Sequence, residues 1–145
     1  MKHILVIHGP NLDLLGKREI DIYGKVTLAE INEAIKQKAR ELGCQVRIKQ
    51  SNSEGEIVSF ISETRDWTDA LIINPAAYSH TSVAIRDAIL AVGIPAVEVH
   101  LSNIYQREGF RQKSLVVGVC RGQIAGFGLQ SYILALEAAV DILEI

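Results

Sequence analysis

The stretch from His8 to Arg18 reads HGPNLDLLGKR and could be a phosphate-binding loop, because it follows a short apolar run and contains Gly-Lys near its end. A P-loop has four residues between its glycines, followed by Lys and then Ser or Thr. Here six residues separate Gly9 from Gly16, and Arg18 replaces the hydroxyl residue. No G-x-G-x-x-G follows the apolar run, and only 6% of residues are aromatic, which is few for a flavin site. The spacing therefore argues against a nucleotide or flavin site.

Polar and titratable residues follow three apolar runs of the chain. They are Asn11, Arg18 and Tyr23 after residues 4–7, Asn74, His80 and Ser82 after residues 70–73, and His100, Ser102, Arg107 and Arg111 after residues 96–99. Residues with a purely structural role at the edge of a sheet would not need this mixture of Asn, His, Tyr and Arg. If the three runs end at one edge of a sheet, the mixture predicts a functional pocket there.

Strands and helices are expected to alternate. Short, β-branched apolar runs predict buried parallel strands at 4–7, 70–73, 96–99 and 115–119. Residues 45–50 alternate apolar with polar side chains, which is typical of an edge strand with one wet face. Amphipathic spacing predicts helices at 27–42, 54–65, 81–92 and 129–143.

Local signals support these helices. Thr27 with Glu30, and Ser53 with Glu56, are capping-box pairs at the start of the first two helices. The last helix is expected to bury a stripe formed by Leu129, Ile133, Leu136, Val140 and Leu143.

The order of elements predicts an α/β fold, a flavodoxin-like doubly wound sheet of five parallel strands in the order 2-1-3-4-5, with helices on both faces. Ligands of such sheets bind beyond the carboxyl ends of the strands, at the switch point between the first and third strands. The polar residues after the three apolar runs would meet there, in a single catalytic domain spanning residues 1–145.

The connection over residues 9–26 is long for a compact domain, and such loops are often lids or binding loops. It carries Arg18 and Tyr23, with Gly16 and Gly24 as candidate hinges. We expect an active-site lid. The alternative is a surface loop with a solvated arginine and a packing tyrosine.

Composition narrows the class of protein. A chain of 145 residues with 48% hydrophobic and 22% charged residues is typical of one globular domain. Its net charge of −2 argues against a nucleic-acid partner. No apolar run reaches a membrane span, and the first apolar run is too short for a signal peptide, so a cytoplasmic location is expected. Cys44 and Cys120 cannot form a disulfide framework, and no spacing suggests a metal site.

The sequence resembles the type II 3-dehydroquinate dehydratases over nearly its whole length. The resemblance rests on five segments in the same order, at residues 9–24, 50–56, 74–88, 98–111 and 126–136. It implies a flavodoxin-like fold, no cofactor and a homododecamer built as a tetramer of trimers. The implied reaction is loss of water from 3-dehydroquinate to give 3-dehydroshikimate through an enolate, a step of the shikimate pathway of aromatic amino acid biosynthesis.

The resemblance also implies catalytic roles. Tyr23 would be the base that takes the proton from C2, with Arg18 favouring its phenolate and Arg107 in support. Asn11 would stabilise the enolate through a bound water. His100 would be the general acid for the leaving hydroxyl, oriented by Glu98 two residues earlier on the same strand.

The remaining implied roles concern substrate binding. Asn74 and Ser102, with backbone N–H groups near Leu101, would hold the substrate carboxylate. His80 and Arg111 would bind ring hydroxyls. Asp87 would reach the site of a neighbouring subunit, or else be an ordinary carboxylate on a helix face.

The chain departs from the family pattern at His8, Asp13, Ile20-Asp21 and Ser53, none of which carries the family's chemistry. Two rival interpretations are a flavodoxin-like binding module and an inactive regulatory or assembly protein. The glycine spacing, which does not match a P-loop, argues against the binding module. The set of Tyr, Arg, Asn and His argues against the inactive protein.

Overall fold

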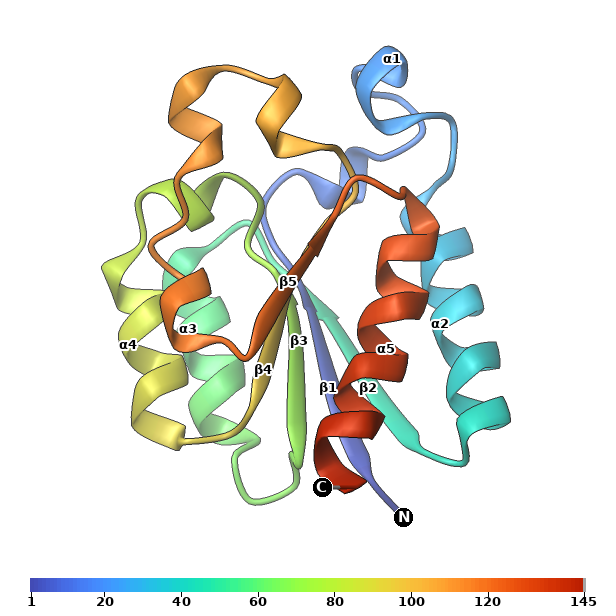
Figure 1. Ribbon diagram of the computed structural model, residues 1–145, viewed down its shortest axis with the longest axis vertical. Coiled ribbons are helices and arrows are strands. Elements are labelled where there is room, and N and C mark those ends of the chain that lie inside the picture. Colours follow the sequence, from blue (N-terminus) through green and yellow to red (C-terminus); the bar gives the residue numbers. More distant parts are fainter. Residues whose placement is uncertain (145) are drawn as a thin grey trace.

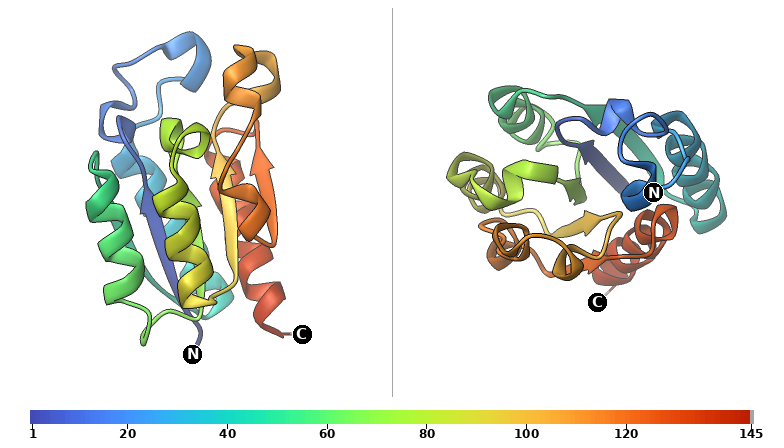
Figure 2. Two further views of the ribbon diagram at one scale, coloured as in Figure 1. Left: turned by 90° about the vertical axis from the view of Figure 1, so that its left-hand side faces the viewer. Right: turned by 90° about the horizontal axis from the view of Figure 1, so that it is seen from above.

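The computed structural model describes residues 1–144 and contains a five-stranded parallel sheet in the order β2-β1-β3-β4-β5, as predicted. The strands are β1 (His3–His8), β2 (Gln45–Gln50), β3 (Ala70–Asn74), β4 (Ala96–His100) and β5 (Gly122–Ala125). All four strand pairs are parallel, so all carboxyl ends lie at one edge. The N-terminus and the end of the last helix lie at the opposite edge (Figures 1 and 2).

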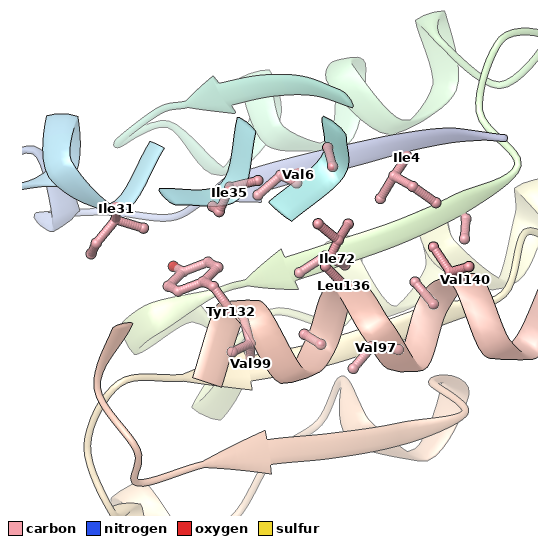
Figure 3. Close-up of a cluster of buried hydrophobic side chains, with 14 of the residues drawn as sticks. Ile4, Val6, Ile31, Ile35, Ile72, Val97, Val99, Tyr132, Leu136 and Val140 are labelled. Atoms are coloured by element: carbon pink, nitrogen blue, oxygen red, sulfur yellow. The ribbon is translucent and has the colours of Figure 1, made fainter. Parts of the chain in front are cut away.

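Helices cover both faces of the sheet. The helices α3 (Glu54–Glu63) and α4 (Val83–Val92) pack on one face, and α2 (Leu28–Leu42) and α5 (Leu129–Glu144) pack on the other (Figure 1). Because successive strand residues point to opposite faces, Ile4 and Val6 join the core under α2 and α5, whereas Leu5 and Ile7 join the core under α3 and α4. Tyr132, which is 1% exposed, belongs to the first core (Figure 3).

The two edge strands differ in how well their sequences predicted them. In β2, exposed and half-buried residues alternate, which confirms the predicted wet strand at an edge. The predicted strand at 115–119 is wrong, because Val117–Val119 forms a 3₁₀ helix. The Oγ of Ser114 accepts hydrogen bonds from the N–H groups of Val116 and Val117, and Val116 fills the second core. The fifth strand follows at Gly122–Ala125, where half-buried edge residues need no apolar run.

The helix ends largely follow the predicted caps. The side chains of Thr27 and Ser53 accept hydrogen bonds from the N–H groups of Glu30 and Glu56 at 3.2 Å, as predicted. Ser82 caps α4 through the N–H of Ile85 at 2.9 Å and does not line the pocket described below. Residues 81–82 therefore precede the helix that was expected to start there.

The buried face of α5 is rotated from the predicted stripe. Its buried residues are Ser131, Tyr132, Ala135, Leu136, Ala139 and Val140. Leu136 and Val140 confirm the prediction, whereas Ile133 is only half-buried. Ala135 and Ala139 are both fully buried. None of the helices within residues 1–144 is both long and apolar enough to cross a membrane.

Candidate active site

A pocket lies at the carboxyl ends of β1, β3 and β4, the predicted switch point of the sheet. The one-turn helix α1 (Ile20–Tyr23) and the 3₁₀ turns Ile104–Gln106 and Gly109–Gln112 lie over this edge (Figure 1). Most of the predicted site residues line the pocket, namely Asn11, Arg18, Tyr23, Asn74, His80, His100, Leu101, Ser102, Arg107 and Arg111. Two do not line it: Glu98 lies behind His100, and Asp87 is exposed on α4.

The phenol oxygen of Tyr23 is held by two guanidinium groups. Arg107 donates to it from Nη1 at 2.6 Å, and Arg18 donates from Nη2 at 3.4 Å. The Arg18 guanidinium also lies over the Tyr23 ring, 4.5 Å from its centroid, and pairs with exposed Glu19 at 2.9 Å. Two cations at one oxygen are well placed to stabilise negative charge on it. The sequence ranked Arg18 first, but Arg107 makes the shorter contact.

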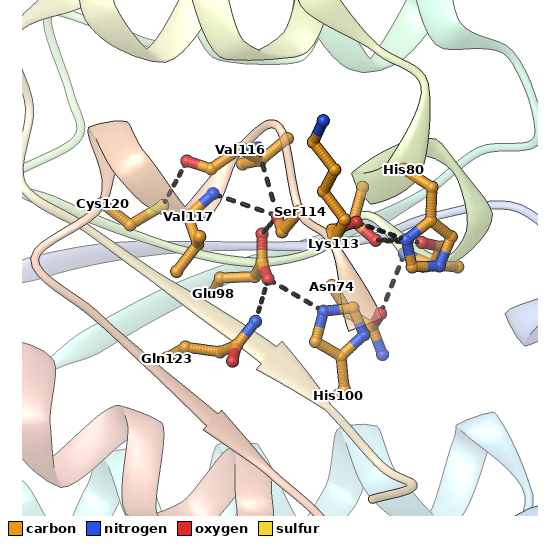
Figure 4. Close-up of polar contacts among 12 residues, drawn as sticks. Asn74, His80, Glu98, His100, Lys113, Ser114, Val116, Val117, Cys120 and Gln123 are labelled. Atoms are coloured by element: carbon orange, nitrogen blue, oxygen red, sulfur yellow. Dashed lines mark hydrogen bonds and ion pairs between the residues drawn. The ribbon is translucent and has the colours of Figure 1, made fainter. Parts of the chain in front are cut away.

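A buried carboxylate orients His100. The Nε2 atom of His100, the last residue of β4, lies 2.9 Å from Oε2 of Glu98, whose side chain is fully buried in the same strand. Ser114 donates to the other Glu98 oxygen at 2.7 Å, and Gln123 donates from β5 (Figure 4). Because a carboxylate only accepts hydrogen bonds, Nε2 of His100 carries the hydrogen, and Nδ1 is the nitrogen left for the pocket.

The same contacts keep Glu98 ionised. Burial alone would raise the pKa of Glu98, but the hydrogen bond and charge of His100, with the hydrogen bonds from Ser114 and Gln123, hold that pKa below its usual 4.5. The predicted pairing of Glu98 with His100 is therefore present, and it has two further supports.

Strained backbone surrounds the floor of the pocket. Asn11 and Ala76 line the pocket with positive φ angles of 69° and 50°, a region that costs energy for residues with a β-carbon. The N–H of Asn11 is tied to the side chain of Asn52 at 2.9 Å. Gly9 donates its N–H to the carbonyl of Asn74 at 2.7 Å, so close that a β-carbon on Gly9 would meet that oxygen at 2.7 Å. Glycine is required here by the close approach of two backbones.

The far wall of the pocket is formed by His80 and Arg111. His80 donates from Nδ1 to the carbonyl of Lys113 at 2.8 Å, because a carbonyl can only accept, and this leaves Nε2 for the pocket. Arg111 donates from Nε to exposed Glu108 at 2.6 Å. Its guanidinium stays at the pocket rim, where it can also bind a hydroxyl or an anion.

Comparisons with known proteins agree with this geometry. The profile of the family described as dehydroquinase class II matches residues 2–140. The chain belongs to the class II dehydroquinase family. It is 56% identical over 138 residues to the 3-dehydroquinate dehydratase of Dictyoglomus turgidum, which covers 95% of each chain.

Further relatives span almost the whole chain. The 3-dehydroquinate dehydratase of Thermoanaerobacter pseudethanolicus is 54% identical over 144 residues, covering 99% of this chain and 97% of the relative. The crystal structure of type II dehydroquinase from Butyrivibrio crossotus has a TM-score of 0.93 and 44% identity, covering 99% of this chain and 98% of that one. The resemblance to this family and its flavodoxin-like fold, both inferred from the sequence, are confirmed.

Three residues that support the site were missed by sequence reasoning. Ser114 and Gln123 hold Glu98, and Tyr132 contacts Asn74 at 3.0 Å. Gln123 pairs in register with Glu98 across β4 and β5, so a correct placement of the fifth strand would have found it. Tyr132 gave no such signal, because its partner lies 58 residues away in the chain.

Other reactive groups take no part in the pocket of this class II dehydroquinase. Burial, and then the charge of Glu98, raise the pKa of the Cys120 thiol to about 12, and burial also raises that of Cys44. Both thiols therefore stay protonated and are poor nucleophiles. Within residues 1–144, no group of three or more His, Cys, Asp or Glu side chains is placed to hold a metal ion.

Proposed function

We propose that the pocket eliminates water from 3-dehydroquinate to give 3-dehydroshikimate through an enolate, with Tyr23 as the base and His100 as the acid. Family membership makes the chain an enzyme, a type II hydro-lyase, and the relatives named above carry the activity in their names. The observation that supports the assignment of roles is the Tyr23 oxygen between Arg107 and Arg18, in the same pocket as His100.

The first step in the proposal removes the proton from C2, next to the ketone. The C2–H bond breaks, the proton passes to the Tyr23 oxygen, and the electron pair moves into the enolate. A tyrosine is protonated at neutral pH unless cations stabilise its phenolate. The bonds from Arg107 at 2.6 Å and Arg18 at 3.4 Å place two positive charges at the oxygen that is proposed to take the proton, and arginine keeps its charge throughout the working pH range.

The enolate oxygen then needs a hydrogen-bond donor. In the proposal, Asn11 supplies it through a bound water, as the family resemblance implies. The backbone of Asn11 is already fixed in a left-handed conformation by the contact with Asn52. A donor held in advance of the reaction costs no reorganisation when charge develops.

The second step expels the C1 hydroxyl. The enolate electrons re-form the ketone and the C1–C2 double bond, the C1–O bond breaks, and His100 donates a proton so that water leaves. The protonated Tyr23 and the neutral His100 must exchange a proton, directly or through solvent, before the next cycle. The buried carboxylate of Glu98 accepts the hydrogen of Nε2 at 2.9 Å and so orients the ring with Nδ1 toward the pocket.

The other predicted roles are proposals of the same kind. Asn74, Ser102 and backbone N–H groups near Leu101 would hold the carboxylate, and His80 and Arg111 would bind ring hydroxyls; all five line the pocket. Residues 9–26, which include the short helix α1, would act as a lid within a single catalytic domain.

The assembly and the location follow from the resemblance alone. We propose a homododecamer built from four trimers, acting in the cytoplasm and in aromatic amino acid biosynthesis. Asp87 is exposed on α4 and lies outside the pocket of its own chain, so its role at a substrate site would need a neighbouring copy. Sedimentation of an active monomer would contradict both the assembly and the role of Asp87.

The test of the reaction is direct. Purified protein is mixed with 3-dehydroquinate, and the ultraviolet absorbance of the conjugated product is followed. Absorbance should rise in proportion to the protein concentration, and His100→Ala should slow it by roughly 100-fold or more. No product at high protein concentration would overturn the proposed reaction.

A further inference from the structure

A chain of buried polar side chains lies behind Asn74, outside the lining of the pocket. Asn74 donates from Nδ2 to the hydroxyl of Tyr132 at 3.0 Å. That hydroxyl lies 2.9 Å from Nδ1 of His8, whose Nε2 lies 2.8 Å from Oδ1 of Asn32. His8, Tyr132 and Asn74 are 0%, 1% and 3% exposed, so water does not compete for these contacts. The chain thus joins side chains from four elements, β1, α2, β3 and α5.

Only one direction of hydrogen bonding satisfies the whole chain. The N–H of Ala76 donates to Oδ1 of Asn74 at 3.0 Å, which identifies the other amide atom as the nitrogen. Since Tyr132 accepts from that nitrogen, its own hydrogen goes to Nδ1 of His8. Nε2 of His8 then carries the hydrogen and donates it to Asn32.

The electrostatics of these side chains agree with that direction. Burial lowers the pKa of His8 from 6.5 to about 4, although the hydrogen bond to Asn32 opposes the shift. Burial likewise raises the pKa of Tyr132 above its ordinary value of 10. Both groups are therefore neutral at neutral pH, as the chain of donors requires. If His8 were protonated, its Nδ1 hydrogen and the hydroxyl hydrogen of Tyr132 would point at each other, and this direction of hydrogen bonding would be lost.

We propose that Tyr132 and His8 are positioning residues that fix the amide of Asn74, so that its second Nδ2 hydrogen is presented to the substrate carboxylate. Held by Ala76 alone, the amide could still pivot about that one contact. Held at both Oδ1 and Nδ2, its plane is fixed. Within residues 1–144, Nδ2 donates only to Tyr132, which leaves its other hydrogen for the pocket that Asn74 lines. The inference rests on the proposed function, because it assigns a role to the carboxylate of that substrate.

The test compares Tyr132→Phe with Thr68→Val. The first variant removes only the hydroxyl that holds Asn74. The second removes a buried hydroxyl that donates to the carbonyl of Thr64, close to the amino end of β3 and away from the pocket. A carboxylate contact is made equally in the ground state and the transition state, so its loss raises KM and leaves kcat unchanged.

Tyr132→Phe should therefore raise KM for 3-dehydroquinate by roughly threefold to tenfold, the value of about one hydrogen bond, with kcat within about twofold of wild type. Thr68→Val should leave both constants unchanged. An unchanged KM in Tyr132→Phe, or an equal rise in KM in both variants, would overturn the proposal.

A second measurement does not depend on turnover or on the folding of Tyr132→Phe. Nitrogen NMR of ¹⁵N-histidine-labelled wild type, with His8→Asn to assign the signals, reports which ring nitrogen of His8 carries hydrogen. The proposal requires a neutral ring with hydrogen on Nε2 at pH 7. Hydrogen on Nδ1 would overturn it even if the enzyme is active. Conversely, the expected tautomer in a wild type without turnover would contradict the proposed function and leave the hydrogen-bond chain intact.

Discussion

Replacing His8 with asparagine should remove a loss of stability that the wild type suffers in mild acid. In the folded protein the pKa of His8 is about 4, whereas an unfolded histidine titrates near 6.5. Between these values the unfolded state binds a proton that the folded state does not. The free energy of unfolding therefore falls as the pH drops through 6.5, and this loss is complete below about pH 4. Asparagine takes up no such proton.

The expected change in the free energy of unfolding follows from the pKa shift of His8. The full effect corresponds to about 3 kcal/mol, and about 2 kcal/mol of it develops between pH 7 and pH 5. Glu98 also destabilises the fold in acid, because its lowered pKa makes its contribution disappear as the pH falls through the folded value. It is present in both proteins, so its effect cancels in the difference between them.

The assay is urea unfolding at pH 7 and pH 5, followed by far-ultraviolet circular dichroism. Fluorescence of Trp67, the only tryptophan in the chain, is less suitable because the ring of His3 stacks on it at 4.5 Å. His8→Asn should lose about 2 kcal/mol less than wild type between the two pH values. Thr68→Val, which removes no titratable group, should keep the wild-type loss. Equal losses in wild type and His8→Asn would refute a neutral, buried His8.

Three further outcomes are expected. Gly9→Ala should destabilise the fold by about 1–3 kcal/mol in the same assay, because its β-carbon would meet the Asn74 carbonyl oxygen at 2.7 Å; wild-type stability would refute that packing. Glu98→Gln should lower kcat by roughly 100-fold or more, since His100 loses its charged partner, and a kcat within threefold of wild type would count against the pair. Borohydride added with substrate should leave activity intact, because the proposed course forms no imine; inactivation would indicate a lysine nucleophile.

The fold was predictable where local patterns carry it. The alternation at 45–50 placed β2 at an edge, and the caps at Thr27 and Ser53 placed two helix starts. The prediction of the fifth strand was wrong because the apolar run at 115–119 packs into the core as a 3₁₀ turn, which Ser114 holds by hydrogen bonds. The fifth strand is instead Gly122–Ala125, which is short, half-buried and poor in apolar residues. An edge strand of this kind forms because it pairs with β4, and this pairing leaves no local pattern in the sequence.

The candidate site was predictable for a different reason. Residues after parallel strands must meet at one edge, so the order of elements was enough to bring Asn11, Asn74 and His100 together. The distances and hydrogen bonds between those residues could not be predicted from the sequence. The short contact from Arg107 to Tyr23 joins residues 84 positions apart. The contact between Tyr132 and Asn74 joins residues 58 positions apart. Such contacts depend on tertiary packing, which spacing in the sequence does not encode.

The central claim is that Tyr23, held by hydrogen bonds from Arg107 and Arg18, takes the proton that starts the elimination. The most direct test measures product absorbance from 3-dehydroquinate for wild type and Tyr23→Phe under identical conditions. The two proteins differ by one oxygen atom, and the groups proposed to hold the carboxylate are unchanged. The wild type should form the conjugated product, and Tyr23→Phe should lose roughly 100- to 10,000-fold in kcat with little change in KM. Turnover by Tyr23→Phe close to that of the wild type would contradict this account.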